Sequence, residues 1–375
     1  MEGSATPPAQ LGRYQILKKL TSGGMAELLL ARATGMSSFE RHVVIKRIHA
    51  AHANDDRLVQ MFLDEARLAA SLHHQNVVQV YDVGEQDGQY FFAMEYVHGE
   101  DLRKLHAKIK GPESQIPLAI VVSIVAAAAS GLHHAHEQRG PDREPLGLVH
   151  RDVSLGNILV GYDGSVKLVD FGLARAAMRT VKTRTGTLKG KSAYMSPEQC
   201  MGKQLDRRSD VFALGIVLYE LATGRRLFKA ANDYLSMTAI VGGDIPKPST
   251  HRADIPLELD EIIMRALAKA PEARYPSAEA MREALEQFAV QAGLRTSTKA
   301  LADYMHQTFG DRPEPWRSDV PMPAAIDDTK AEDGIVEPPA APEVISHPLD
   351  RSSSPIALAH ATVPQPPDDD EDDDE

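Results

Sequence analysis

The sequence predicts an α+β fold in which a small antiparallel sheet is followed by a larger, mostly helical part. Short β-type runs separated by turn residues occur at 14–20, 27–33 and 89–96. Beyond residue 101 the pattern becomes helical, and the longest apolar run, at 116–129, indicates a buried helix. Strands that precede helices, without regular alternation between them, are typical of an α+β fold with segregated layers.

The hydrophobic content, the net charge and the cysteine count exclude some classes of protein. The chain has 375 residues and 43% hydrophobic content, which is enough for a sizeable core. Its net charge of -12 comes from residues 321–375, which contain fifteen acidic residues and only two basic ones, Lys330 and Arg351. The rest of the chain is nearly neutral, which argues against a nucleic-acid partner. The single cysteine, Cys200, excludes an internal disulfide, and we expect a reducing, cytoplasmic location.

No segment predicts insertion into a membrane. Residues 1–10 lack the basic start and the apolar core of a secretory signal. The apolar run at 116–129 contains Pro117 and Ser123 and is shorter than the roughly 20 residues that cross a bilayer. We therefore expect no membrane span.

The strongest chemical signal follows the predicted buried helix. Asp152 and Asn157 lie on one expected loop, and two short β-type runs follow at 158–160 and 166–169 with good turn residues between them. Folding these runs as a hairpin brings Asp170 back beside Asn157. A carboxylate and an amide oxygen together suit a hard cation such as Mg²⁺. Asp152 remains in place to accept a proton from a hydroxyl group.

This stretch resembles the catalytic loop and the metal-binding motif of a eukaryotic-like (Hanks-type) bacterial serine/threonine protein kinase. Residues 150–152 match the family's His-Arg-Asp, with Asn157 downstream, and residues 170–172 match its Asp-Phe-Gly. The resemblance covers about residues 14–290. It implies a two-lobed protein-kinase fold, ATP and Mg²⁺ as cofactors, and protein substrates with serine or threonine acceptors.

Two further positions complete the polar machinery that the resemblance implies. Lys46 ends an apolar strand at 43–46, as in the family's Val-Ala-Ile-Lys, and Glu65 lies on an amphipathic helix that follows. In the family these two side chains pair, and the lysine contacts the α- and β-phosphates of ATP. The resemblance thus implies Asp152 as the catalytic base and Asn157 and Asp170 as the metal ligands.

The expected phosphate loop departs from the family's Gly-x-Gly-x-x-Gly-x-Val. Thr21, Gly23, Ala26 and Leu28 stand at its defined positions, so only the central glycine is kept. Small residues still allow backbone amides to approach phosphates, although an ordinary hairpin turn has the same composition. The resemblance implies nucleotide contacts at Leu20, Thr21, Ser22, Gly23, Gly24, Met25, Ala26, Leu28, Val44, Lys46, Met94, Glu95, Val97, Asp101 and Leu159.

Two more strands, at 77–84 and 89–96, lead into a hinge between the lobes. By family position, the Glu95 carbonyl and the Val97 amide face the adenine edge. Met94 stands at the back of the pocket and Asp101 is placed to meet the ribose. Because the backbone does most of this recognition, the side chains at 95 and 97 are equally consistent with ordinary strand ends.

Residues 173–195 match the family's activation segment, which closes here with Ser-Pro-Glu in place of Ala-Pro-Glu. In kinases of this pattern, a phosphate on this segment usually neutralises the arginine before the catalytic aspartate, here Arg151. The resemblance therefore implies autophosphorylation, with a polar loop of incidental threonines as the alternative. The candidate acceptors are Thr180, Thr183, Thr185 and Thr187.

Two departures from the family pattern look coupled. Ser154 stands where serine/threonine members usually have lysine, and Lys191 stands where they usually have threonine. In the family these two side chains meet beside Asp152. We therefore hypothesise that Lys191 supplies the cation that steadies the γ-phosphate. The alternative is that Lys191 points to solvent and Ser154 only hydrogen-bonds the loop.

The helical lobe carries expected structural contacts. Glu198 is expected to form the family's buried ion pair with Arg274, and Asp210 to anchor the backbone of the catalytic loop. Histidine pairs at 73–74 and 133–134 lack further ligands at metal-site spacing, so we expect no metal site there.

The chain divides into four expected parts. They are a flexible N-terminus at 1–13, a kinase domain at 14–290 with an N-lobe at 14–95 and a C-lobe at 99–290, an extension at 291–320, and a disordered tail at 321–375. In the extension, residues 299–316 are expected to pack a short helix on the C-lobe. The tail has ten prolines, no aromatic residue and an acidic end, so it buries too little apolar surface to fold.

Two other functional classes stay open. A pseudokinase scaffold binds nucleotide and partners without turnover, and the altered glycine loop favours it. A small-molecule phosphotransferase of related fold is the second, although residues 189–198 resemble the family's platform for peptide substrates. The sequence makes no prediction of the oligomeric state.

Overall fold

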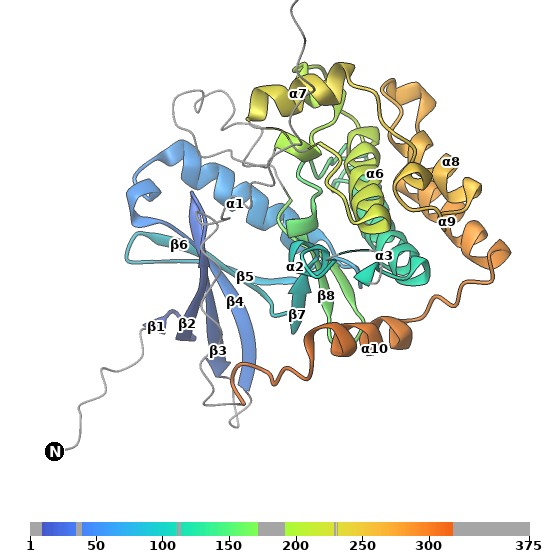
Figure 1. The fold of residues 1–375 in the computed structure, drawn as a ribbon. Helices are drawn as coiled ribbons and strands as arrows, with labels where there is room; N and C mark the ends of the chain where they lie inside the picture. Colours follow the sequence, from blue (N-terminus) through green and yellow to red (C-terminus); the bar gives the residue numbers. More distant parts are fainter. Residues whose placement is uncertain are drawn as a thin grey trace, which may run out of the picture. The chain divides into compact units, whose positions relative to one another are not determined.

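The computed structural model describes residues 10–34, 40–109, 111, 114–171, 192–228, 230 and 232–317. The chain divides into two compact units, 1–325 and 326–375, and all described residues belong to the first. That unit has the predicted α+β organisation. A sheet with one packed helix forms the N-lobe, and helices form most of the C-lobe (Figure 1).

The N-lobe is built on an antiparallel sheet in the order β1-β2-β3-β4-β6-β5. Its strands are β1 (Gln10–Leu11), β2 (Tyr14–Ser22), β3 (Ala26–Thr34), β4 (Glu40–Ile48), β5 (Val80–Gln86) and β6 (Gln89–Glu95). Helix α1 (Asp56–Ser71) is capped by Asp55, whose carboxylate accepts hydrogen bonds from two amides of the first turn. The buried face of α1 carries Phe62, Glu65 and Ala66 and packs on β5 and β6. Burial of this face directs Glu65 toward the sheet.

Two boundaries in the N-lobe differ from the predicted ones. The short strand β1 pairs with β2, with Leu11 opposite Tyr14, so the sheet begins before residue 14. β5 begins at Val80, because Val77 instead forms a bridge with Leu168 in a second sheet. The β1–β2 pairing involves only a two-residue strand, and the partner of Val77 is distant in the sequence. An alternating pattern of apolar and polar residues therefore reveals neither pairing.

The second sheet, in the order β7-β8-β9, carries the catalytic stretch. Its strands are β7 (Gly99–Asp101), β8 (Ile158–Gly161) and β9 (Val166–Leu168). The predicted hairpin is therefore confirmed, and its turn holds Gly164 at a φ of +80°, a conformation that favours glycine. Ile158 lies opposite Leu168 across the hairpin. This register brings together the residues that flank the two strands.

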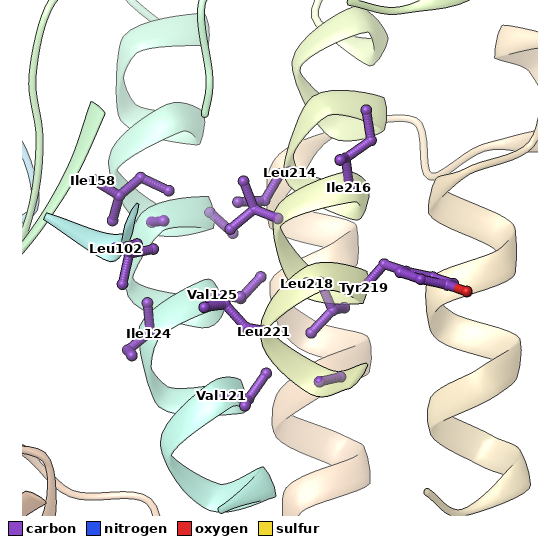
Figure 2. Close-up of a cluster of buried hydrophobic side chains, with 14 of the residues drawn as sticks. Leu102, Val121, Ile124, Val125, Ile158, Leu214, Ile216, Leu218, Tyr219 and Leu221 are labelled. Carbon is purple, nitrogen blue, oxygen red and sulfur yellow. The ribbon is translucent and has the colours of Figure 1, made fainter. Parts of the chain in front are cut away.

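Two apolar helices, α3 (Leu118–His136) and α6 (Arg208–Thr223), form the centre of the C-lobe. Every residue of α6 after the first is buried, as expected of a helix that is apolar on all sides. Figure 2 shows Val125 in the space between the two helices, while Tyr219 points away from α3. By length and composition α3 is the one helix in the described ranges that could cross a membrane, but 56% of its apolar window is buried. The prediction of a buried helix is confirmed.

The other described helices surround this core. They are α2 (Leu102–His106), α5 (Pro197–Cys200), α7 (Asp233–Gly242), α8 (Leu257–Ala266), α9 (Ala278–Gln291) and α10 (Thr298–Phe309). Short 3₁₀ turns lie at Ala50–His52, Leu155–Asn157, Ser192–Tyr194, Pro248–Thr250 and Pro271–Ala273. α10 packs on α3 and β8, so the extension contains the helix predicted there. The predicted ion pair between Glu198 and Arg274 is also present, and both side chains are buried.

Candidate active site

Lys46, near the end of β4, is held between two carboxylates. Its Nζ atom lies 2.6 Å from Glu65 Oε1 on α1 and 2.8 Å from Asp170 Oδ1 after β9. The side chains of Lys46 and Glu65 are 12% and 7% exposed, so both are largely removed from water. Burial alone would lower the pKa of Lys46, but the two carboxylates outweigh it and raise that pKa above its ordinary value. The lysine is therefore a fixed cation that joins the two lobes.

Asp152 and Asn157 meet across the catalytic loop. The side-chain amide of Asn157 donates through Nδ2 to Asp152 Oδ2 at 2.6 Å and to the Asp152 carbonyl at 2.7 Å. The backbone amide of Val169 donates to the carbonyl of Asn157 at 3.0 Å, which brings Asp170 close to Asn157. The side-chain nitrogen of Asn157 is turned to Asp152, and metal binding by its oxygen and by the Asp170 carboxylate stays a prediction. Oxygen ligands of this kind suit a hard divalent cation such as Mg²⁺.

Asp210, in the first turn of α6, holds the catalytic loop in place. Its carboxylate accepts hydrogen bonds from the backbone amides of His150 at 2.7 Å and Arg151 at 2.8 Å, and it lies 2.8 Å from His136 Nε2. Burial would raise the pKa of Asp210, but the contact with His136 and the backbone donors outweigh it and lower that pKa. Arg151 has a φ of 66°, which is a strained conformation, and the hydrogen bond from its amide to Asp210 maintains it. The predicted anchor is present.

The loop between β2 and β3 is closed on itself and tied to the end of β4. The amide of Gly23 donates to the carbonyl of Ala26 at 2.8 Å, so in this structure it does not face outward as a phosphate ligand would need. The carbonyls of Gly23 and Gly24 lie 2.8 Å from His49 Nε2 and 3.1 Å from His52 Nε2. Because a carbonyl only accepts, both ring nitrogens carry protons here. His49 and His52 belong to no motif, so the sequence does not predict these contacts.

The hinge residues have side-chain roles that the sequence analysis did not anticipate. Glu95 forms an ion pair with Lys167 of β9, with the lysine Nζ 2.8 Å from Oε1. Asp101 caps α2, accepting hydrogen bonds from the amides of Arg103 at 2.9 Å and Lys104 at 3.1 Å. A ribose contact at Asp101 therefore has to share the carboxylate with the helix cap. Met94 is buried and lines a small pocket together with Glu65 and Asp170.

Most other residues implied to contact nucleotide gather in one apolar cluster of the N-lobe. Ala26, Val44 and Met94 are buried in it, and Leu20, Met25, Leu28 and Val97 pack against it. Thr21 and Ser22 lie at the end of β2, and Leu159 on β8 lies opposite Asp101. Phe171 packs on the ring of His150 at 4.5 Å, whereas Gly172, Lys191 and the threonines of the activation segment lie outside the described residues.

Within the described ranges, no group of three or more His, Cys, Asp or Glu side chains is arranged to hold a metal ion. His74 and His134 instead stack on each other at 4.9 Å.

Comparison with known proteins gives the same assignment. Residues 14–285 match the protein kinase domain family. The tyrosine-protein kinase MasK of Myxococcus xanthus is 43% identical over 315 residues, which cover 84% of this chain and 49% of MasK. The serine/threonine-protein kinase PrkC of Bacillus subtilis is 38% identical over 271 residues, which cover 72% of this chain and 39% of PrkC. The chain thus matches less than half the length of each of these relatives.

Solved structures agree with this family. The crystal structure of the PknI kinase domain of Mycobacterium tuberculosis superposes with a TM-score of 0.56 at 27% identity, covering 76% of this chain and 99% of that domain. Protein kinases use ATP and a divalent metal, and the oxygen ligands at Asn157 and Asp170 fit that requirement. By fold, by polar site and by sequence, this chain belongs to the protein kinase family and to its bacterial eukaryotic-like (Hanks-type) serine/threonine branch.

Proposed function

We propose that this chain transfers the γ-phosphoryl group of ATP to serine and threonine hydroxyls of proteins. The observation that carries the proposal is the contact of Lys46 with both Glu65 and Asp170 at 2.6 and 2.8 Å. This arrangement places a phosphate-binding cation beside a proposed metal ligand. It also requires Lys46 and Glu65 of the N-lobe to lie next to Asp170, which follows β9. A chain that had lost catalysis would have no need to keep a buried lysine between two carboxylates.

The proposed chemistry divides among five side chains. Lys46 binds the α- and β-phosphates and is oriented by Glu65. Asp152, held by Asn157 Nδ2, orients the acceptor hydroxyl and takes up its proton as the oxygen attacks the γ-phosphorus. The bond from the γ-phosphorus to the bridging oxygen breaks in the same step, and ADP leaves with that oxygen. Asn157 Oδ1 and Asp170 would hold Mg²⁺, which would offset the negative charge of the phosphate oxygens when bound.

We also propose that the chain phosphorylates its own activation segment. The supporting observation is Arg151, whose buried Nε finds no hydrogen-bond partner among the described residues. An unpaired buried guanidinium nitrogen is costly, and a phosphate dianion would satisfy it by a charge-assisted bond. Thr183, Thr185 and Thr187 are the preferred acceptors, ahead of Thr180.

Tyrosine is the second candidate acceptor, and two observations favour it. The relative MasK carries the name of a tyrosine-protein kinase. Ser154 also stands where serine/threonine members of the family usually have lysine. We place serine and threonine first because PrkC and the PknB of Mycobacterium leprae are named for those residues. With one cysteine in the chain, a reducing, cytoplasmic site of action fits the same proposal.

The test is phosphorylation by the purified 375-residue chain. The protein is incubated with labelled ATP and Mg²⁺, with and without a generic basic protein as acceptor, and the labelled residues are identified by acid hydrolysis and mass spectrometry. Label on serine and threonine is the expected result, and label confined to tyrosine would transfer the assignment to the second candidate.

An Asp152→Asn variant is the matched control, since it removes the base and keeps a side chain of the same shape. Its turnover should fall by about 10²–10⁴-fold while its thermal unfolding stays unchanged. Saturable binding of ATP by the native chain without any phosphotransfer would overturn the proposal in favour of a pseudokinase scaffold. Label on a small-molecule acceptor alone would favour the related phosphotransferase.

A further inference from the structure

The segment after α10 leaves the C-lobe and reaches the N-lobe. α10 itself is fixed to the C-lobe, because Leu301 and Met305 are 2% and 0% exposed and the helix packs on α3 and β8. Gly310 ends the helix with a φ of 75°. Figure 1 shows the orange chain beyond α10 running to the ends of β3 and β4. We call residues 311–317 the strap.

Trp316, at the end of the strap, contacts one ring on each side of the sheet-to-hinge junction. Its ring is parallel to that of His42 on β4, with centroids 3.9 Å apart and planes inclined by 2°. It meets the ring of Tyr96 edge-on, at 5.1 Å and 72°. Val43 lies opposite Glu95 where β4 and β6 pair, so His42 and Tyr96 occupy the next position on each strand. Trp316 therefore covers the point at which the sheet passes into the hinge.

The strap is stiffened by its own sequence. Pro313 and Pro315 restrict the backbone, and the amide of Arg317 closes a turn by donating to the carbonyl of Glu314 at 2.9 Å. The side chains of Arg317 and Glu314 add an ion pair at 2.6 Å. A segment restricted in this way loses less conformational entropy when Trp316 docks, because part of that entropy is already absent from the free chain.

Tyr96 and His42 are both partly buried. Burial raises the pKa of Tyr96 to about 12, with further contributions from Glu100 and from Glu314 of the strap. Burial likewise lowers the pKa of His42. Both directions are those expected of rings screened from solvent, so Trp316 packs against Tyr96 and His42 as a partly desolvated cluster.

We propose that Trp316 is a positioning residue for nucleotide binding. The strap ties α10 to the hinge and holds Tyr96, so that its neighbours Glu95 and Val97 keep their backbone groups in line with an adenine edge. The inference rests on the proposed function, because it assigns a purpose to the hinge of a nucleotide-binding site. The strap lies beyond residues 14–285, which match the family.

Fluorescence gives the first test, because the chain has a single tryptophan and its emission reports Trp316 alone. The 375-residue chain is titrated with ADP and Mg²⁺, and calorimetry on the same samples measures binding independently. The expected result is a saturable change in emission with the midpoint found by calorimetry. Nucleotide binding with no change in emission would count against the strap, whereas no binding in either measurement would overturn the proposed function as well.

Kinetics gives the second test. Trp316→Ala should raise the KM for ATP about five- to tenfold and change kcat less than about twofold, and Trp316→Phe should restore most of the affinity. Val290→Ala is the matched control, since Val290 is an apolar side chain of α9 that is 81% exposed. The control should behave as the native chain does. A Trp316→Ala variant that unfolds at a lower temperature but keeps a native KM would overturn the proposal in favour of a purely structural role.

A double-mutant cycle with His42 tests the proposal without relying on a single variant. If Trp316 acts through its stacked partner, His42→Ala should raise the KM in the same direction, and the double variant should be no worse than Trp316→Ala alone. Dissociation constants for ADP replace KM if acceptor phosphorylation proves too slow to measure. Fully additive effects of the two changes would show that the rings act independently and would refute the positioning role.

Discussion

Arg274 donates to both oxygens of Glu198, through Nη1 to Oε1 at 2.7 Å and through Nη2 to Oε2 at 2.8 Å. The arginine side chain is completely buried, and the glutamate is 7% exposed. Ser209 Oγ adds a third hydrogen bond to the carboxylate at 2.6 Å. The pair joins α5, which follows the activation segment, to the loop before α9, so two distant parts of the C-lobe are held by one contact.

Loss of one member of this pair should be costly. Arg274→Met should lower the free energy of unfolding by about 3–5 kcal/mol, because Glu198 would stay buried without its partner. Urea unfolding followed by circular dichroism measures the effect. The double variant Arg274→Met with Glu198→Gln should recover part of the loss, since the stranded charge is gone. A single-variant loss below about 1 kcal/mol would contradict this account.

The polar site should separate catalysis from folding. Lys46→Met and Asp170→Asn should each abolish phosphotransfer, because one removes the phosphate-binding cation and the other weakens the metal ligand. Transfer of label from ATP and thermal unfolding are measured on the same preparations. We expect cooperative unfolding in both variants. Near-native turnover in either one would refute the assigned mechanism, and loss of folded protein would give the residue a structural role instead.

Stability should depend on pH through His106. Burial, with a smaller contribution from Arg226, lowers the pKa of His106 from 6.5 to about 4. Below pH 6.5 the unfolded chain takes up a proton that the folded chain does not, so stability is lost as the pH falls from 6.5 toward 4. His106→Leu should therefore be more stable than the native chain at pH 5 by about 1 kcal/mol, or roughly 2–4 °C in Tm. An equal difference at pH 5 and pH 8 would show that protonation plays no part.

The activation segment should carry phosphate in the active protein. Mass spectrometry of the active chain should find it on Thr183, Thr185 or Thr187, and alanine at all three should lower kcat, because Arg151 would lack its anionic partner. Arg151→Gln should make the enzyme insensitive to the state of these threonines. A fully active preparation without phosphate on the segment would rule the mechanism out.

The exchange of Ser154 and Lys191 is tested by a double-mutant cycle. Lys191→Thr should lower kcat strongly if Lys191 steadies the γ-phosphate, and adding Ser154→Lys should restore much of it. The rates are measured at saturating ATP, so that changes in nucleotide affinity do not enter. Purely additive losses would refute the exchange and leave the kinase assignment intact.

The positions of residues within one continuous motif follow from local patterns. Asp152, Asn157 and Asp170 flank a hairpin whose turn and strands are encoded locally, so the sequence alone places them together. The alternating and apolar runs also located the main strands and the buried helix α3. Local patterns suffice here because the partners are near in sequence or follow a fixed spacing.

Contacts between side chains that are distant in the sequence cannot be predicted from local sequence patterns. His49 and His52 reach the loop carbonyls only because β4 returns beside the β2–β3 turn. Trp316 was expected to stay on the C-lobe, and its stacking on His42 depends on where α10 ends in space. Neither contact leaves a periodic or compositional signal, since each depends on one side chain meeting one surface.

The turn between β8 and β9 sets a practical limit on how short the protein can be made. A Cβ atom at Gly164 would stand 2.0 Å from the carbonyl oxygen of Thr298, so the catalytic hairpin and the start of α10 fit together without spare room. A chain that ends at residue 285, where the family match ends, would lack α10. The apolar side of the hairpin that α10 covers would then be exposed to solvent. The smallest piece worth producing for crystallisation or inhibitor screening therefore ends at residue 317.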